Sequence, residues 1–404
     1  MSHNAVVTSL TSANRSYWDG LVSILIFFVI FFPSSIAADF YRLDVAVFGF
    51  FIFNFLCLIL YFRYFQLSFT AIIIFLCLVV ILLFNTVISG YSEYAFGYSL
   101  SLFPMLILGL FRINRAPSFN LVLGLYYSVV VFIFFFAYLG FFFSGIRDVI
   151  IAFYSGGYLG LSERFLETFS PVSIFISHSY AGFFYFLILF SSKYLAYTGV
   201  LRNFNFVIII ICLISMLLLK SGSSYFFFLY SLIFLSATSI LSIKNSKVML
   251  FVFIFLLMIL TGLVYFSIDY FLLLIERIVG DGGNGLLSRY GDGVLRVNID
   301  YILNNPFLGI GFSYSSDFYY TDSDYVVSFL RFGFFGFSIY YIYLFLLLRR
   351  FIGVFVGRIY FAFFVGAFLC FMISMPVFSF YRTAPLLVLL VLLFSSLAYR
   401  GPRH

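Results

Sequence analysis

Charged residues are scarce in this chain of 404 residues, because only 9% are Asp, Glu, Lys or Arg. A soluble globular protein has about 25%, so the composition excludes a cytosolic enzyme, and the 64% hydrophobic content excludes a disordered chain. Cysteine is rare too. The four cysteines form no CxxC pair, so they give no sign of a disulfide scaffold or of a cysteine-ligated metal site.

Long apolar runs, by contrast, recur from one end of the chain to the other, and the mean hydropathy is +1.15. A helix needs about 20 mostly apolar residues to cross a bilayer, where its backbone must satisfy its own hydrogen bonds. The sequence therefore predicts an all-α polytopic membrane protein, a single integral membrane domain over 1–404. We expect twelve spans, at roughly 21–38, 43–62, 69–89, 98–111, 118–143, 171–192, 204–219, 223–242, 248–266, 325–348, 355–373 and 377–399.

The distribution of charge predicts the orientation of these spans. With both termini in the cytoplasm, the inner segments hold thirteen basic residues and one acid, Asp19. Cytoplasmic loops of membrane proteins carry such an excess of Lys and Arg. The net charge of +7 then reflects topology rather than binding to nucleic acid.

Two predicted loops are long, and both fall on the outer, periplasmic face: 144–170 and the larger 267–324. Loops of this length are usually functional or disordered, and the larger one contains apolar segments of its own. We expect a short helix over 293–303 that Asp292 caps and that lies on the membrane surface. Its buried stripe is predicted to be Val294, Val297, Tyr301 and Ile302.

A few basic residues depart from the usual bias by falling on the outer side: Arg147, Arg164, Lys220, Arg277, Arg289 and Arg296. Arginine suits the forked binding of phosphate, and the sequence favours that role for Arg289. Arg296 stands four residues before Asp300, so an ordinary helix-surface ion pair explains it equally well. Lys220 either snorkels towards water or contacts an anion beside the serines that follow it.

Each charged or titratable residue inside a predicted span has two interpretations, a functional role or a structural contact. Arg331 is a functional candidate because an arginine is costly in the membrane, yet an ion pair with Asp324 would account for it as well. Arg382 carries the same ambiguity. For His178, between two serines, the sequence favours an interhelical hydrogen bond over catalysis.

Several motifs, taken together, resemble a known family. Ser288-Arg289, followed by Asn304-Asn305-Pro306-Phe307-Leu308-Gly309-Ile310-Gly311, resembles the SR … P-L-x-G-x-G block of the O-antigen polymerase and ligase superfamily. Thr321-Asp322-Ser323-Asp324-Tyr325 follows, with Gly333 eight residues on. Asp322 falls where ligases carry His and where polymerases often carry Asp. Arg164-Phe-Leu-Glu-Thr-Phe-Ser-Pro resembles R-x-x-G-x-F-x-N-P, and Leu219-Lys220-Ser221-Gly222-Ser223 resembles an S-x-S-R span end with Lys220 in place of the arginine.

The resemblance is to the polymerase (Wzy) branch, and it implies an inner-membrane glycosyltransferase that needs no metal or nucleotide cofactor. Such an enzyme joins undecaprenyl-diphosphate-linked oligosaccharide repeats at the periplasmic face, with a chain-length regulator (Wzz type) as partner. On this reading Arg289 clamps the leaving diphosphate and Asp322 or Asp324 takes the acceptor proton. Substrate contacts are expected from Arg164, Lys220, Arg277, Arg296, Tyr325 and Arg331.

Two alternatives stay open. An O-antigen ligase would transfer the glycan to a lipid A core by the same chemistry, although position 322 lacks its histidine. A flippase for lipid-linked oligosaccharides, or another transporter, would need polar residues along a cavity through the membrane. The charges of this sequence avoid the centres of the spans, which favours chemistry at the membrane surface over transport.

Overall fold

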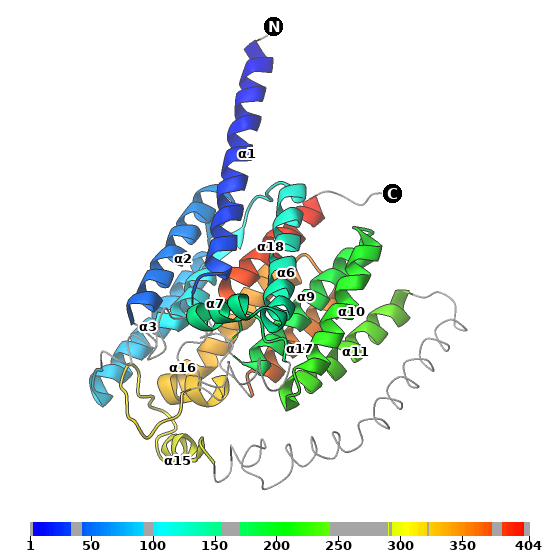
Figure 1. The fold of residues 1–404 in the computed structure, drawn as a ribbon. Coiled ribbons are helices and arrows are strands. Elements are labelled where there is room, and N and C mark those ends of the chain that lie inside the picture. The colour runs from blue at the N-terminus through cyan, green and yellow to red at the C-terminus, as the bar shows by residue number, and fades with distance from the viewer. Residues whose placement is uncertain are drawn as a thin grey trace.

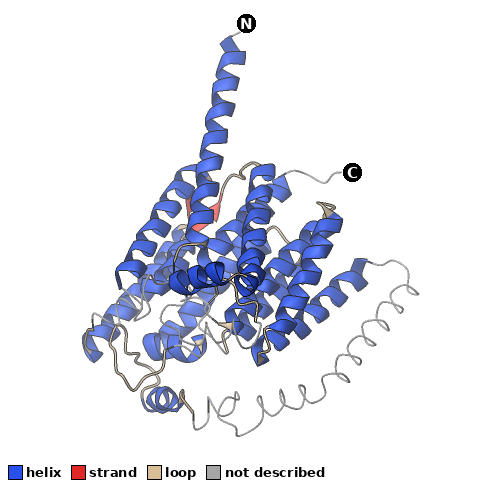
Figure 2. Cartoon of the chain, viewed as in Figure 1, coloured by secondary structure: helices blue, strands red, loops and turns tan. Residues whose placement is uncertain are grey.

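The computed structural model describes residues 3–33, 43–92, 100–154, 170–175, 177–242, 290, 293–320, 323–373 and 382–399. Over these residues the chain is mostly helical, with one small antiparallel pair of strands (Figure 1, Figure 2). The helices form a bundle from which the N-terminal part of α1 projects (Figure 1).

The first part of the bundle has helices close to the predicted spans 43–62, 69–89 and 118–143, but the span predicted over 21–38 is wrong in its bounds, because the helix there runs from His3 to Ile30. Its elements, in chain order, are α1 (His3–Ile30), α2 (Leu43–Arg63), β1 (Phe65–Leu67), α3 (Phe69–Ser89), the short 3-10 helix η1 (Leu100–Leu102), α5 (Phe103–Leu108), β2 (Phe111–Ile113) and α6 (Phe119–Phe142). The prediction of a single span over 98–111 is wrong at its end. The helix stops at Leu108 because the next residues form β2, in which Phe111 pairs with Leu67.

The second part contains the remaining described helices: α7 (Ser144–Tyr154), α9 (His178–Tyr197), α10 (Arg202–Leu218), α11 (Gly222–Ser242), α15 (Arg296–Asn304), α16 (Asp324–Leu348), the π-helical turn η2 (Arg349–Gly353), α17 (Arg358–Phe371) and α18 (Thr383–Tyr399). The predicted loop 144–170 thus begins with a helix, α7, which lies across the bundle rather than along it (Figure 1). The predicted span 248–266 lies outside the described residues.

The bundle has two ends of different character. The hairpin end carries β1 and β2, and there Phe65 packs against Phe351 of η2 with 5.8 Å between the ring centroids. The opposite end, which we name the loop end, carries α15 and the loop 305–320 (Figure 1). At the loop end the hydroxyl of Ser313 donates to the carbonyl of Ser89, at the end of α3, over 3.1 Å.

Two helices form the centre of the bundle. In α9 nearly every side chain from Tyr180 to Ser192 is buried, and in α18 every side chain from Thr383 to Ser396 is buried. Aromatic pairs join the central helices to their neighbours: Phe183 of α9 stacks on Phe371 of α17 with ring centroids 4.6 Å apart. Such pairs stabilise the packing beyond the area that they bury.

The outer helices present apolar side chains to their surroundings. In α3, Phe69 is 77% exposed and Val87 is 85% exposed. Three helical segments of the described chain are long and apolar enough to cross a membrane, Phe69–Ser89, Phe119–Gly140 and Asp324–Gly353. An apolar surface of this extent is not stable in water, so the protein is a helical membrane-associated protein.

Hydrogen bonds to one carboxylate hold the hairpin end together. Asp19 of α1 is buried and accepts from the Tyr64 hydroxyl and, over 3.0 Å, from the backbone N–H of Ser118 before α6. Burial, together with the hydrogen bond to Asp19, raises the pKa of Tyr64, so this phenol stays protonated as a donor. The one acid predicted for the inner segments therefore joins α1, α2 and α6.

Candidate active site

The central feature of the loop end is a break in α16. Gly333 has φ 66° and ψ −179°, so the helix stops after Phe332 and starts again at Phe334. A residue with a side chain rarely adopts this φ. The first part of α16, residues 324–332, is therefore a short half-helix of its own, and it carries Asp324, Tyr325 and Arg331.

The loop that contains the P-F-L-G-I-G sequence fills this break. The N–H of Ile310 donates to the Leu330 carbonyl over 2.8 Å, and the N–H of Gly311 donates to the Arg331 carbonyl over 3.0 Å. In return, the N–H of Phe334 donates to the Pro306 carbonyl over 3.0 Å. The glycine-containing sequence 306–311 and the half-helix 324–332 with its break at Gly333 thus contact each other directly.

Glycine is required where these backbones meet. A Cβ added at Gly309 would lie 2.1 Å from the Arg331 carbonyl oxygen, and one added at Gly333 would lie 2.4 Å from the Phe307 carbonyl oxygen. Gly311 has φ 56°, and a Cβ there would lie 2.4 Å from the Thr86 hydroxyl. The spacing of these glycines therefore reflects the close approach of the loop to the break.

The half-helix begins with a buried carboxylate. The hydroxyl of Ser323 caps the helix by accepting from the N–H of Val326, and Tyr290 donates to the same hydroxyl over 2.7 Å. Asp324 follows in the first turn, 1% exposed, and its N–H donates to the Met372 carbonyl over 2.9 Å. A carboxylate is favoured at the start of a helix by the helix dipole.

A buried guanidinium lies near the other end of the same half-helix. Arg331 is 1% exposed and its guanidinium carbon is 5.4 Å from the centre of the Tyr320 ring, a cation–π contact. Tyr320 in turn stacks on Tyr314, with ring centroids 5.5 Å apart. The structure thus brings together a buried carboxylate, a buried cation and a pair of stacked tyrosines at the loop end.

Tyr325, predicted to bind sugar, lies against other parts of the protein. Its hydroxyl donates to the Leu369 carbonyl of α17 over 2.9 Å, and its ring stacks on Tyr341 at 5.3 Å between centroids. In this arrangement it ties the start of α16 to α17.

The short helix predicted over 293–303 is present as α15, but it begins only at Arg296, with Leu295 rather than the predicted Asp292 at its cap position. Its predicted buried stripe is also partly wrong. Val294 and Val297 are each 47% exposed. The buried positions are Leu295 and Asn298, because the Asn298 amide hydrogen-bonds both the N–H and the carbonyl of Tyr319, over 2.9 and 2.7 Å. An internal polar contact, which apolar periodicity does not detect, sets the rotation of α15.

Arg296 takes the simpler of its two predicted roles. Its Nε lies 2.9 Å from the Asp300 carboxylate, and about half of each side chain is exposed. Arg147 likewise neighbours the exposed Asp148, at 4.0 Å. Arg296 and Asp300 stand four residues apart, and exposed helix pairs at this spacing contribute only about 0.3–0.5 kcal/mol.

Lys220 occupies a turn between helices. It is exposed and has φ 50°, between the end of α10 and the start of α11. Serines surround the neighbouring helix starts: Ser179 of α9 lies 2.6 Å from Ser223 of α11, hydroxyl to hydroxyl. Helix α11 begins towards the loop end of the bundle (Figure 1), and the Ser224 hydroxyl in its first turn also donates to the His178 carbonyl over 3.4 Å.

Arg382 has a role in the packing of the bundle. It is fully buried before α18, and its guanidinium donates to the carbonyls of Ile30 and Phe32 over 3.2 and 3.0 Å. It also lies 5.1 Å from the centre of the Tyr154 ring of α7. These contacts hold the end of α1 against α7 and α18.

Four of the predicted site residues lie outside the described residues: Arg164, Arg277, Arg289 and Asp322. The predicted phosphate clamp around Arg289 therefore stays a prediction. Of the predicted residues that the structure describes, it joins Asp324, Tyr325 and Arg331 on one half-helix, and it puts Arg296 on the neighbouring α15.

The sequence did not single out the polar residues at the end of α3. Asn85 and Thr86 are buried in an otherwise very apolar helix. The Asn85 amide donates to the carbonyls of Arg331 and Phe332 over 3.1 and 3.2 Å, and the Thr86 hydroxyl accepts from the N–H of Phe312 over 2.9 Å. Polar side chains are energetically costly within a membrane span, so their presence in this apolar run could have identified them from the sequence.

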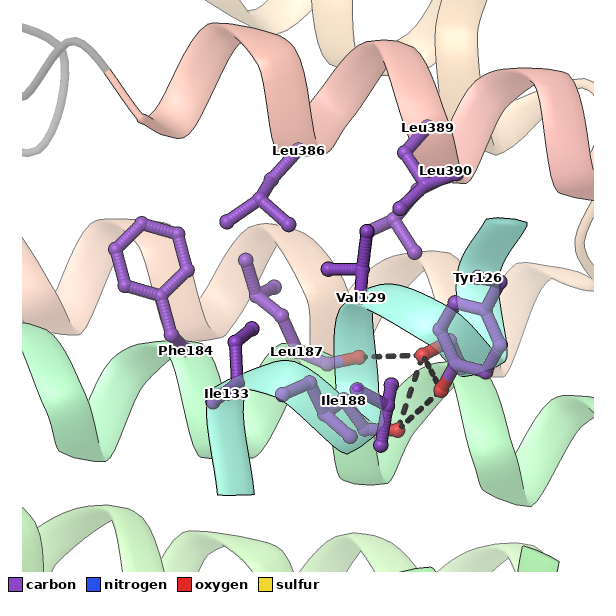
Figure 3. A pocket seen from close by; sticks show the side chains of 11 residues that line it. Tyr126, Val129, Ile133, Phe184, Leu187, Ile188, Leu386, Leu389 and Leu390 are labelled. Carbon is purple, nitrogen blue, oxygen red and sulfur yellow. Dashed lines mark hydrogen bonds between the residues drawn. The ribbon is translucent and has the colours of Figure 1, made fainter. Parts of the chain in front are cut away.

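A small cavity lies between α6, α9 and α18, and none of the candidate site residues lines it (Figure 3). Its volume is about 10 Å³, which is near the lower limit for one water molecule. Beside it, the Tyr126 hydroxyl lies 2.8 Å from the Ser191 hydroxyl and 2.9 Å from the Ser192 hydroxyl. The Tyr126 hydroxyl also donates to the Ile188 carbonyl over 3.1 Å (Figure 3). This is a packing feature and is too small for a substrate.

No family model, curated protein or solved structure matches this chain.

Proposed function

We propose that this protein is an O-antigen polymerase that joins lipid-linked oligosaccharide repeats at the outer face of the bacterial inner membrane. The observation that carries the proposal is the contact between the loop 306–312 and the break in α16 at Gly333. These segments hold the sequence blocks that resemble the family, and their packing holds a buried carboxylate, Asp324, and a buried cation, Arg331, on one half-helix.

The proposed chemistry is a direct glycosyl transfer. A hydroxyl of the next repeat attacks the anomeric carbon of the growing chain, the new glycosidic bond forms, and the bond to the lipid diphosphate breaks. The electron pair leaves with the diphosphate, and the proton of the attacking hydroxyl passes to a carboxylate, Asp324 or Asp322. Direct displacement inverts the anomeric centre.

Cations stabilise the negative charge that builds up on the leaving diphosphate. We assign direct contact with the diphosphate to Arg289, while the buried Arg331 acts through its charge and the exposed Arg296 and Lys220 steer the anionic substrate towards the loop end. An exposed cation steers an anionic substrate, whereas a buried one interacts more strongly because water is excluded. Arg331 therefore contributes more to the reaction than Arg296.

The orientation and the twelve spans belong to the proposal too. The basic residues of the hairpin end, among them Arg63, Arg112 and Arg350, would face the cytoplasm under the positive-inside rule. The loop end would then face the periplasm, where lipid-linked repeats are exposed.

A transporter is the competing function, and one observation favours it: discontinuous helices such as α16 are common at the substrate sites of transporters. In those proteins the freed backbone groups coordinate the substrate or its coupling ion. Here the carbonyls of Leu330 and Arg331 accept hydrogen bonds from the loop 306–312. The break is thus filled by the protein's own chain, which favours an enzyme.

The test is a reconstitution of the purified protein with a lipid-linked repeat, followed by gel separation of the glycans. The proposal predicts a ladder of longer glycans that Arg331→Ala abolishes and that Arg296→Ala leaves largely intact. Asp324→Asn and Asp322→Asn are compared in parallel, and full activity in both would remove the carboxylate from the mechanism. Movement of the repeat across the bilayer without new glycosidic bonds would establish the transporter instead.

A further inference from the structure

The end of α3 carries buried polar side chains that the proposed reaction does not use. Asn85 and Thr86 are buried and follow a run of apolar residues, Asn85 is only 2% exposed, and the partly buried Ser89 lies one turn further on. An amide that is removed from water must find partners, and inside a membrane protein such polar residues are costly and rare. Their position therefore calls for a specific role.

All three side chains are directed at the break in α16 and at the loop that fills it. Asn85 donates to the carbonyls of Arg331 and Phe332, the last two residues of the half-helix. Thr86 accepts from Phe312, and the hydroxyl of Ser89 donates to the Gly309 carbonyl over 3.5 Å. Carbonyls at the end of a helix lack partners within the helix, and Asn85 supplies donors for two of them.

The consequence for the site follows from where these carbonyls are. The backbone of Arg331 accepts from Asn85 on one side and from Gly311 on the other. The side chain of the same residue is buried against Tyr320. Asn85 thus holds the main chain from which the buried cation of the proposed site extends.

We propose that Asn85 is a positioning residue, which orients Arg331 by holding the end of the half-helix 324–332. The expected effect on catalysis rests on the proposed function. The expected effect on the half-helix is independent of it. Asn85 contacts no substrate in this account. It acts through Arg331, and its loss lowers turnover more than it weakens substrate binding.

The experiment compares Asn85→Asp with a matched control, Asn54→Asp. Asn85→Asp keeps the shape of the side chain and removes both N–H donors. Asn54 is also an asparagine within a membrane helix, but among the residues that the structure describes its amide donates only to the Phe50 carbonyl one turn earlier, over 2.8 Å. Asn85→Leu is the second variant, in case a carboxylate at this position prevents folding.

The first readout is hydrogen exchange of the full-length protein in detergent. We expect amide protons in the segments 309–312 and 330–335 to exchange about 10- to 100-fold faster in the Asn85 variants, because lost hydrogen bonds raise the population of open states. The control and helix α9 should show no change. Unchanged exchange at the break, or faster exchange along every helix, would overturn the proposal.

The second readout is the rate of glycan extension. The Asn85 variants should lose most of their turnover number while KM changes little, and combining either one with Arg331→Ala should cost no more than Arg331→Ala alone. Losses that instead multiply would show that Asn85 acts independently of Arg331. If the wild-type protein extends no glycan at all, the proposed function fails, and hydrogen exchange still decides whether Asn85 holds the half-helix.

Discussion

Replacing Gly309 by alanine tests the packing at the break in α16 most severely. The added Cβ would lie 2.1 Å from the Arg331 carbonyl oxygen, while real Cβ contacts are essentially never under 3.0 Å. The loop must therefore move by about 0.9 Å, the difference between these two distances. That movement lengthens the hydrogen bonds from Ile310 and Gly311 to the half-helix, which now measure 2.8 and 3.0 Å.

The size of the effect follows from those two bonds. Each contributes about 1 kcal/mol when intact, and a buried group left without its partner costs about 1–3 kcal/mol. We therefore expect Gly309→Ala to lower the free energy of unfolding by about 2–4 kcal/mol. The measurement is denaturant unfolding in detergent micelles, followed by circular dichroism.

The matched control is Gly124→Ala in α6, where an added Cβ meets nothing within 4 Å. Because alanine is the better helix former, this variant should gain about 0.5–1 kcal/mol. Equal stability of the two variants would refute the close approach between loop and half-helix, and with it the structural reason for the glycine spacing.

Three further substitutions give distinct outcomes in the same unfolding assay. Asp19→Ala should cost about 2–3 kcal/mol, because the buried Tyr64 hydroxyl and an N–H at the start of α6 lose a charged acceptor; an unchanged midpoint would contradict this. Tyr126→Phe should cost about 1 kcal/mol, since two serine hydroxyls lose a partner. Arg296→Ala should cost less than about 0.5 kcal/mol because its ion pair is exposed, and a larger loss would mean that this pair is more than a surface contact.

Exposed residues of the same types serve as controls for these substitutions. Asp148 has a side chain that is 72% exposed, and Tyr197 is 64% exposed. Neither Asp148→Ala nor Tyr197→Phe should change stability by more than about 0.5 kcal/mol. A cost as large as that of Asp19→Ala or Tyr126→Phe would show that burial does not decide these effects.

Most helix positions could be predicted from the sequence, because a helix that crosses a membrane requires a continuous run of apolar residues. The predicted spans 43–62 and 69–89 agree with α2 and α3 to within a residue. The ends were less accurate where local chemistry decides them. The predicted span 171–192 begins as a helix only at His178, because the Ser177 hydroxyl caps it by accepting from the N–H of Tyr180.

The break in α16 could not be predicted from hydropathy, since 325–348 is mostly apolar on both sides of Gly333, and Gly333 is one glycine among several in the spans. Its cause is a contact with a loop more than twenty residues earlier and with Asn85, which is further away still. The resemblance to a family did draw attention to Gly309, Gly311 and Gly333. It gave no reason for them until their backbones were seen to meet.

The same distinction applies to the candidate site. Residue type and spacing identified Asp324 and Arg331, and both are buried on one half-helix. Whether a basic residue is buried or exposed depends on tertiary packing, however. From the sequence, Arg296 and Arg331 each had both a functional interpretation and an ion-pair interpretation. Burial separates them, because Arg296 forms an exposed ion pair while Arg331 packs against Tyr320.

The most direct test of the proposed function is a mass spectrum of lipid-linked glycans from cells that lack this protein. A polymerase predicts that single repeats remain, on the lipid carrier or on the lipid A core, and that longer chains disappear. Expression of the wild-type protein should restore the longer chains, and expression of Arg331→Ala should not. Long glycans of normal length in the deficient cells would contradict the proposal that this protein joins the repeats.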